Sequence, residues 1–79
     1  MKVEIFGTPT CGYCTQSVQM CESNGISYTY CDLIKDPTMK DTLEKRIGNV
    51  IKTVPQIFVD GDYLQGGYTA LRDKLSNSG

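Results

Sequence analysis

The sequence contains no histidine and no tryptophan among its 79 residues. Histidine is the usual general base near neutral pH and a common metal ligand, so the chain lacks the most frequent source of both functions. Any acid–base or nucleophilic chemistry must therefore come from cysteine, carboxylate, tyrosine or lysine side chains.

The chain also lacks long apolar runs and blocks of like charge. No segment approaches the roughly 18 apolar residues of a membrane span, and the first residues lack the apolar core of a signal peptide. Eight basic and nine acidic side chains give a net charge of −1, without the basic patch typical of nucleic-acid binders. We therefore expect a cytoplasmic protein that binds neither membranes nor nucleic acid.

The length and composition fit one globular domain over residues 1–79, because two domains would need a longer chain. The hydrophobic fraction of 39% and the charged fraction of 22% are ordinary for a folded protein. The pattern of apolar residues predicts an α/β fold with the order βαβαββα. The first two strands should be parallel, and the last two should form a hairpin turned at residues 60–62.

The expected element boundaries follow from caps, glycines and prolines. Strands are expected at 2–6, 26–33, 54–59 and 63–65. Helices are expected from Cys11 to about Asn24, from Asp36 to about Gly48, and after an N-cap at Thr69. Residues 76–79 are expected to form a frayed tail.

The Cys11-Gly12-Tyr13-Cys14 segment stands where the first strand leads into the first helix. Cys11 should occupy the N-cap, where the N–H groups of Tyr13 and Cys14 and the helix dipole stabilise a thiolate. Cys14, one turn later, can reach back to form a disulfide with Cys11. The sequence therefore predicts a reversible redox switch with Cys11 and Cys14 as the catalytic pair.

A Cys-x-x-Cys pair can also be half of a zinc site, and Cys21 and Cys31 are the remaining cysteines. Cys21 lies on the apolar stripe of the first predicted helix and Cys31 lies inside a predicted strand, so they do not form a second ligand pair. We expect both to be small core residues and expect no metal site. Structural zinc and a second, regulatory disulfide are the alternatives.

Pro55 lies near the start of the third predicted strand, which should run antiparallel to the first and bring Pro55 beside the two cysteines. If the Val54–Pro55 bond is cis, the Val54 backbone would face outward and could pair with a peptide; a trans proline is the alternative. Gly66 and Gly67 precede the last helix, whose free N–H groups could bind a carboxylate. A glycine pair at such a place can also be only a turn.

Three segments occur in this order along the chain: the Cys11-Gly12-Tyr13-Cys14 motif, Thr53–Val59 and Gly66–Thr69. Together they resemble the glutaredoxin family over the whole chain. The resemblance is to dithiol members of the short bacterial or phage-like form. It implies a thioredoxin fold, with a four-stranded mixed sheet flanked by three helices. It also implies that glutathione is the reducing co-substrate.

The resemblance assigns a role to each matched residue. Cys11 matches the attacking thiolate and Cys14 the resolving thiol. The positions that bind glutathione are matched by Tyr13, Thr53, Val54, Pro55, Gly67, Tyr68 and Thr69. The implied activity is that of a monomeric, glutathione-dependent thiol-disulfide oxidoreductase that reduces protein disulfides and glutathione mixed disulfides. Ribonucleotide reductase is one candidate partner, and thioredoxin reductase is an alternative source of electrons.

The sequence departs from the family pattern at three positions. Thr8 replaces a lysine that many members carry before the first cysteine, so Lys52 or Arg46 is a candidate to supply that charge. Ala70 replaces a frequent aspartate after the glycine pair. Gly12 replaces a proline, and a small residue there accompanies a bridging [2Fe-2S] cluster in some members. A dimeric, glutathione-ligated [2Fe-2S] carrier is therefore the alternative function.

Overall fold

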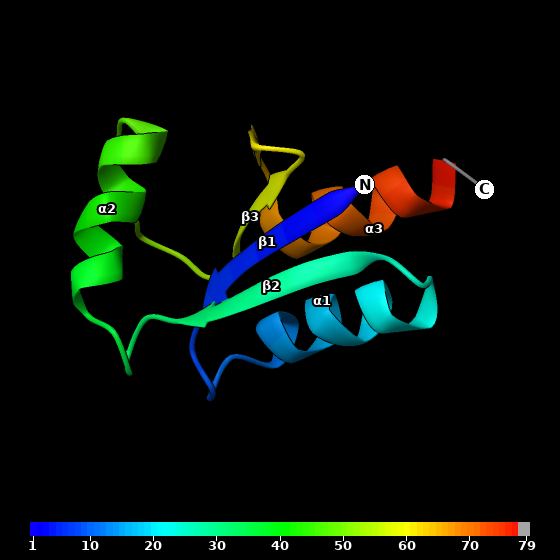
Figure 1. Cartoon of the computed structure of the whole chain (residues 1–79), viewed down its shortest axis with the longest axis horizontal. Coiled ribbons are helices and arrows are strands. Elements are labelled where there is room, and N and C mark those ends of the chain that lie inside the picture. Colours follow the sequence, from blue (N-terminus) through cyan, green and yellow to red (C-terminus); the bar gives the residue numbers. More distant parts are fainter. Residues whose placement is uncertain (78–79) are drawn as a thin grey trace.

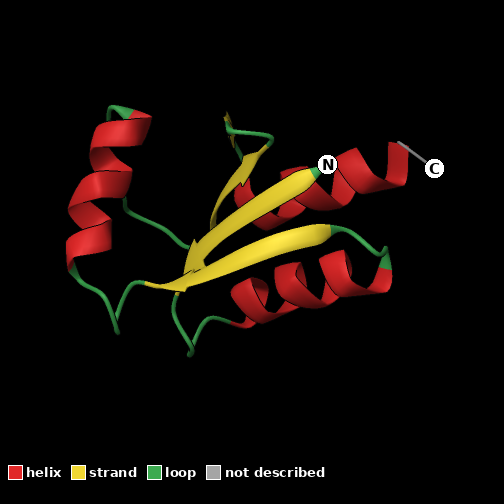
Figure 2. Ribbon diagram, in the orientation of Figure 1, coloured by secondary structure: helices red, strands yellow, loops and turns green. Residues whose placement is uncertain are grey.

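The computed structural model describes residues 1–77, which form a four-stranded mixed sheet with helices on both faces (Figures 1 and 2). The strands are β1 (Lys2–Gly7), β2 (Ser27–Asp32), β3 (Gln56–Val59) and β4 (Asp62–Leu64). The helices are α1 (Gly12–Ser23), α2 (Thr38–Ile47) and α3 (Gly67–Asn77). The predicted order βαβαββα is confirmed. None of the helices in the described residues is long and apolar enough to cross a membrane.

The sheet has the strand order β2-β1-β3-β4. β1 lies in the middle, parallel to β2 and antiparallel to β3, with Ile5 opposite Ile57. The β3–β4 hairpin turns at Asp60 and Gly61, whose φ angles of 52° and 86° are both positive. An Asp-Gly pair suits this tight turn, since both residues enter the left-handed region more easily than most. The predicted hairpin is confirmed, although Asp62 belongs to β4 and not to the turn.

Alternation along the strands divides the core into two clusters on opposite faces of the sheet. α1 and α3 cover one face (Figure 1), where Val3 and Ile5 point. The buried members of this cluster are Val3, Ile5, Cys21, Ile57, Val59 and Leu71. α2 covers the other face through Leu43, which packs with Phe6 and Phe58. Each β1 residue thus faces the helix layer that its place in the alternation dictates.

Several predicted boundaries differ from the structure: α2 begins at Thr38 and not at Asp36, β2 and β4 are shifted by one residue at their ends, and three further differences have a clear physical cause. β3 begins at Gln56 and not at residue 54, because Pro55 has no N–H to donate to the sheet. α3 begins at Gly67, so Thr69 lies inside its first turn and is not its N-cap. The helix also continues through Ser76 to Asn77, because Leu75 packs on the core and anchors the last turn. The rest of the predicted tail, residues 78–79, lies outside the described residues.

The antiparallel pairing of β1 with β3 decides where the sequence motifs meet. The C-terminal end of β1 lies beside the start of β3, where Phe6 pairs with Gln56. α1 follows β1 after a short loop, and α3 packs beside α1 on the same face. The cysteine motif, the proline segment and the glycine pair therefore gather at one edge of the sheet.

Arg46 ties α2 to the sheet. Its Nη1 and Nη2 donate hydrogen bonds of 3.0 and 2.8 Å to the Glu4 carboxylate, and its guanidinium carbon lies 3.8 Å from the centre of the Phe58 ring. Hydrogen bonding to Arg46 is the main reason that the pKa of Glu4 lies below its ordinary 4.5, with the charges of Arg46 and Lys2 acting in the same direction against burial. The Arg46 and Glu4 side chains are 36% and 29% exposed, so solvent screens much of their attraction.

The ion pair makes the stability depend on pH. Glu4→Gln should lower the free energy of unfolding by about 0.5 to 1 kcal/mol at neutral pH. Because the folded-state pKa of Glu4 is depressed, its contribution is present above the ordinary value of 4.5 and is lost as the pH falls through the folded-state value. Urea unfolding of both proteins from neutral to acid pH should show the difference shrinking in acid.

Asp62→Asn is the matched control, since the Asp62 carboxylate forms no ion pair within residues 1–77. It removes the same charge from the sheet. A Glu4→Gln effect that is the same at every pH, or equal to the Asp62→Asn effect, would contradict the role assigned to the ion pair.

Candidate functional site

Cys11 is the N-cap of α1, as predicted. Its backbone is extended, with φ −88° and ψ 112°, and its Sγ accepts a hydrogen bond of 3.3 Å from the Cys14 N–H. Within the described residues, the Tyr13 N–H, which the sequence also suggested as a donor, forms no hydrogen bond with this sulfur. Cys11 is partly exposed. Its sulfur therefore lies at the positive end of the helix and within reach of solvent.

Cys14 has a different environment from Cys11. It is only 1% exposed, and its Sγ fills the space beside Gly7, where any Cβ would overlap it. Burial raises the pKa of Cys14 to about 12, and its hydrogen bond with Cys11 adds to the rise. The Cys14 thiol therefore stays protonated at neutral pH and faces Cys11 and the interior of the protein.

The Val54–Pro55 peptide bond is cis and lies beside Cys11. The Cys11 Sγ is 3.6 Å from the Val54 carbonyl oxygen, which accepts the hydrogen bond of the thiol. The predicted neighbourhood of Pro55 and the cysteine pair is thereby confirmed. Of the two isomers that the sequence left open, the structure has the cis form.

The glycine pair lets α3 approach the proline segment closely. Gly66 and Gly67 have φ angles of +106° and +59°, in the region that favours glycine. A Cβ at Gly67 would lie 2.9 Å from the Pro55 carbonyl oxygen, so a larger residue would push the two segments apart. The pair is therefore more than a turn, because it brings the N-terminus of α3 to the site.

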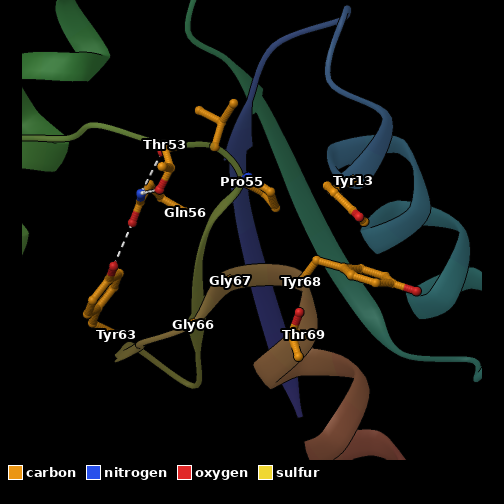
Figure 3. Close-up of a pocket in the computed structure, with 10 residues that line it drawn as sticks. Tyr13, Thr53, Pro55, Gln56, Tyr63, Gly66, Gly67, Tyr68 and Thr69 are labelled. Carbon is orange, nitrogen blue, oxygen red and sulfur yellow. Dashed lines mark hydrogen bonds between the residues drawn. The ribbon is translucent and has the colours of Figure 1, made fainter.

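Two tyrosines join the start of α1 to the start of α3. The rings of Tyr13 and Tyr68 have centroids 5.2 Å apart and planes inclined by 31°. Tyr13 is 58% exposed, so one face of this pair is open to a ligand. Figure 3 shows the two rings side by side at the wall of a cavity.

This cavity, of about 250 Å³, collects the proline segment, the glycine pair and the two tyrosines. Its lining includes every position that the family resemblance connects with glutathione, namely Tyr13, Thr53, Val54, Pro55, Gly67, Tyr68 and Thr69. Gly66, Gln56 and Tyr63 complete the lining (Figure 3). Cys11 does not line the cavity itself, but its Sγ contacts Val54, which does.

Sequence reasoning missed Gln56 and Tyr63. The Tyr63 hydroxyl donates a hydrogen bond of 2.7 Å to Gln56 Oε1, and Gln56 Nε2 donates one of 2.6 Å to the Thr53 carbonyl. The signal that could have found the pair is the hairpin register, in which Tyr63 lies opposite Phe58. Gln56 and Phe58 share a face of β3, so Gln56 is the diagonal neighbour of Tyr63.

The other two cysteines pack in different cores. Cys21 is fully buried between α1 and the sheet, which confirms its predicted role, whereas Cys31 is only partly buried, on the α2 face. Burial raises the pKa of both thiols. Opposite faces of the sheet separate them, which argues against a disulfide between them. No three Cys, Asp or Glu side chains of residues 1–77 are grouped as metal ligands, so the zinc alternative has no ligand set.

Comparison with known proteins agrees with this geometry. The glutaredoxin family model matches residues 3–64. A glutaredoxin of Vibrio cholerae is 38% identical over 84% of this chain and 82% of its own length. Glutaredoxin 1 of Escherichia coli is 35% identical over 87% and 86%.

A solved structure of the same fold was also found. The structure of reduced Escherichia coli glutaredoxin superimposes with a TM-score of 0.80 at 32% identity, covering 98% of this chain and 95% of that one. The predicted thioredoxin fold is confirmed by this match. The chain therefore belongs to the glutaredoxin family of glutathione-dependent thiol-disulfide oxidoreductases.

Proposed function

We propose that Cys11 attacks the disulfides of proteins and the mixed disulfides of glutathione, that Cys14 resolves the intermediate, and that glutathione binds in the 250 Å³ cavity. The observation that carries the proposal is the asymmetry of the two cysteines. Cys11 caps α1 and is partly exposed, whereas Cys14 is buried behind it.

The reaction is a two-electron exchange of thiols and disulfides. The Cys11 thiolate attacks one sulfur of the substrate, forms a mixed disulfide and releases the first substrate thiol. The Cys14 sulfur, after losing its proton, then attacks Cys11 Sγ and releases the second substrate thiol. The substrate is reduced and the protein carries a Cys11–Cys14 disulfide. One glutathione attacks Cys11 and frees Cys14, and a second releases oxidised glutathione and restores both thiols.

The buried position of Cys14 supports its role as the resolving thiol. Its raised pKa, about 12, makes it a poor nucleophile toward disulfides in solution. Part of that rise comes from Cys11, through a hydrogen bond and through charge. When Cys11 is bound in a mixed disulfide it carries no charge, so the charge contribution disappears and Cys14 ionises more readily. Burial, the largest cause of the raised pKa of Cys14, is unchanged in the mixed disulfide, so the pKa falls only in part.

The cavity offers glutathione three kinds of contact. The backbone of Val54 can pair with the backbone of the cysteinyl residue as a strand would. The N-terminus of α3, at Gly67 to Thr69, offers N–H groups to the γ-glutamyl carboxylate. The Tyr13–Tyr68 pair supplies an apolar wall. Sulfur of a bound glutathione would then lie near Cys11, because Cys11 Sγ contacts Val54.

Lys52 is the cation that we assign to the remaining glutathione carboxylate. Thr8 cannot supply this charge, and Arg46 is already paired with Glu4. Lys52 is exposed and lines a second cavity, of about 280 Å³, that shares Thr53 with the first. Its ammonium group can therefore reach the side of the site opposite to α3.

The expected setting is the cytoplasm, where the glutathione pool is reducing enough to drive a glutaredoxin. We propose that the protein acts as a monomer on exposed protein disulfides, with ribonucleotide reductase as one candidate substrate. The alternative of an iron–sulfur carrier is not favoured, because the similar proteins that cover most of the chain include Glutaredoxin 1 of two genera.

Single serine variants test the roles of the two cysteines. Cys11→Ser should reduce activity to the uncatalysed background on both a glutathionylated peptide and a protein disulfide, because no other thiol is placed to attack. Cys14→Ser should keep most activity on the glutathionylated peptide and lose it on the protein disulfide. Both assays follow NADPH consumption with glutathione and glutathione reductase. Wild-type rates for Cys11→Ser on either substrate would reverse the assignment.

Lys52→Met tests the charge that replaces the missing lysine. The KM for glutathione should rise roughly two- to fivefold with little change in kcat, and added salt should reduce the difference from wild type. Lys74→Met is the control, since Lys74 lies in the last turn of α3, away from the helix end at the cavity. Equal KM values for the two variants would remove Lys52 from the binding site.

A further inference from the structure

Tyr63, Gln56 and Thr53 form a chain of hydrogen bonds at the wall of the cavity (Figure 3). The Tyr63 hydroxyl donates to Gln56 Oε1 at 2.7 Å, and Gln56 Nε2 donates to the Thr53 carbonyl oxygen at 2.6 Å. A longer contact of 3.4 Å joins Gln56 Nε2 to Thr53 Oγ1. Gln56 is only 7% exposed, so few water molecules can replace these partners.

The chain fixes which way the Gln56 amide points. An amide has an acceptor end and a donor end, and only the NH₂ end can bond to the Thr53 carbonyl. The oxygen then needs a donor on the other side, and the Tyr63 hydroxyl is that donor. The Thr53 carbonyl disfavours a flipped amide, whose oxygen would face it, and the Tyr63 hydroxyl satisfies the buried Gln56 oxygen in the observed orientation. Tyr63 therefore stabilises Gln56 in the orientation that binds Thr53.

The Thr53 carbonyl controls the direction of the Val54 N–H. The two groups belong to the same planar peptide unit, so fixing the C=O fixes the N–H, which points the opposite way in a trans peptide. The Val54 carbonyl, on the other side of that residue, lies 3.6 Å from Cys11 Sγ. The hydrogen-bond chain thus sets the orientation of a backbone donor next to the reactive sulfur.

Thr53, Gln56 and Tyr63 also separate two cavities at the surface. Thr53, Gln56 and Tyr63 line both the 250 Å³ cavity and the 280 Å³ cavity on the side of Lys52. A ligand that extends from one cavity to the other must cross this hydrogen-bonded wall. The wall is therefore placed to affect ligand position without taking part in the reaction.

We propose that Tyr63 and Gln56 are positioning residues that aim the Val54 N–H at the cysteinyl backbone of glutathione. This inference rests on the proposed binding of glutathione in the cavity. Tyr63 acts through Gln56, and Gln56 acts through the Thr53 carbonyl. Loss of either side chain should weaken the binding of glutathione and leave the two cysteines unchanged.

Tyr63→Phe removes only the hydroxyl and keeps the ring, which packs 5.5 Å from Phe58. The KM for glutathione should rise roughly three- to tenfold, as expected for one lost hydrogen bond, with kcat within about twofold of wild type. Reduction of a small non-peptide disulfide with dithiothreitol should be unchanged, because neither compound has a peptide backbone. Tyr28→Phe is the control, since Tyr28 does not line the cavity and packs on the α1 face of the sheet.

A second variant tests whether the two residues act as one unit. Gln56→Met keeps a similar length but cannot donate, so it should raise the KM at least as much as Tyr63→Phe. Adding Tyr63→Phe to Gln56→Met should change nothing further, because the hydroxyl acts only through the amide.

Each outcome separates this inference from the proposed function. If glutathione reduces the wild-type protein but Tyr63→Phe and Gln56→Met keep its KM, the inference fails and the proposed function stands. A parallel loss of stability and of dithiothreitol-driven activity would show a merely structural role and would also overturn the inference. If glutathione does not reduce the wild-type protein at all, both fail.

Discussion

The hydrogen bond from the Cys14 N–H to Cys11 Sγ is the contact on which the rest of the site depends. It caps α1, so it is part of the fold, and it places a sulfur at the positive end of a helix, so it is part of the chemistry. Gly7 makes the arrangement possible, because the absence of its side chain leaves room for the Cys14 sulfur. Two identical residues therefore differ in their surroundings: Cys11 is partly exposed at a helix N-terminus, and Cys14 is buried with a raised pKa.

The site is built largely from backbone groups, which explains how a chain without histidine can carry out thiol–disulfide exchange. The N-termini of α1 and α3 supply N–H groups, and the segment before β3 supplies the Val54 peptide groups. Pro55 precedes the regular pairing of β3, and Gly67 lets α3 begin close to it, because a Cβ at Gly67 would lie only 2.9 Å from the Pro55 carbonyl oxygen. Side chains such as Gln56 and Tyr63 then hold this backbone in place.

Sequence reasoning could predict what depends on local pattern and strand direction. The order of elements follows from apolar periodicity, and the closeness of Pro55 to Cys11 follows from the antiparallel pairing of β1 and β3. Sequence reasoning failed where contacts between distant segments determine the local structure. Thr69 is a good N-cap by local preference, yet α3 begins at Gly67, which packs closely against Pro55, and so starts three residues earlier than an N-cap at Thr69 predicts. Likewise, only the structure shows that Arg46 is engaged by Glu4.

The measurement that tests the asymmetry of the two cysteines most directly is their rate of alkylation in the reduced wild-type protein. Short exposure to iodoacetamide at neutral pH, followed by peptide mapping, gives a rate for each thiol. We predict that Cys11 reacts about tenfold or more faster than Cys14, because it is partly exposed at the helix N-terminus while Cys14 is buried with a raised pKa. Equal rates, or faster labelling of Cys14, would contradict this account.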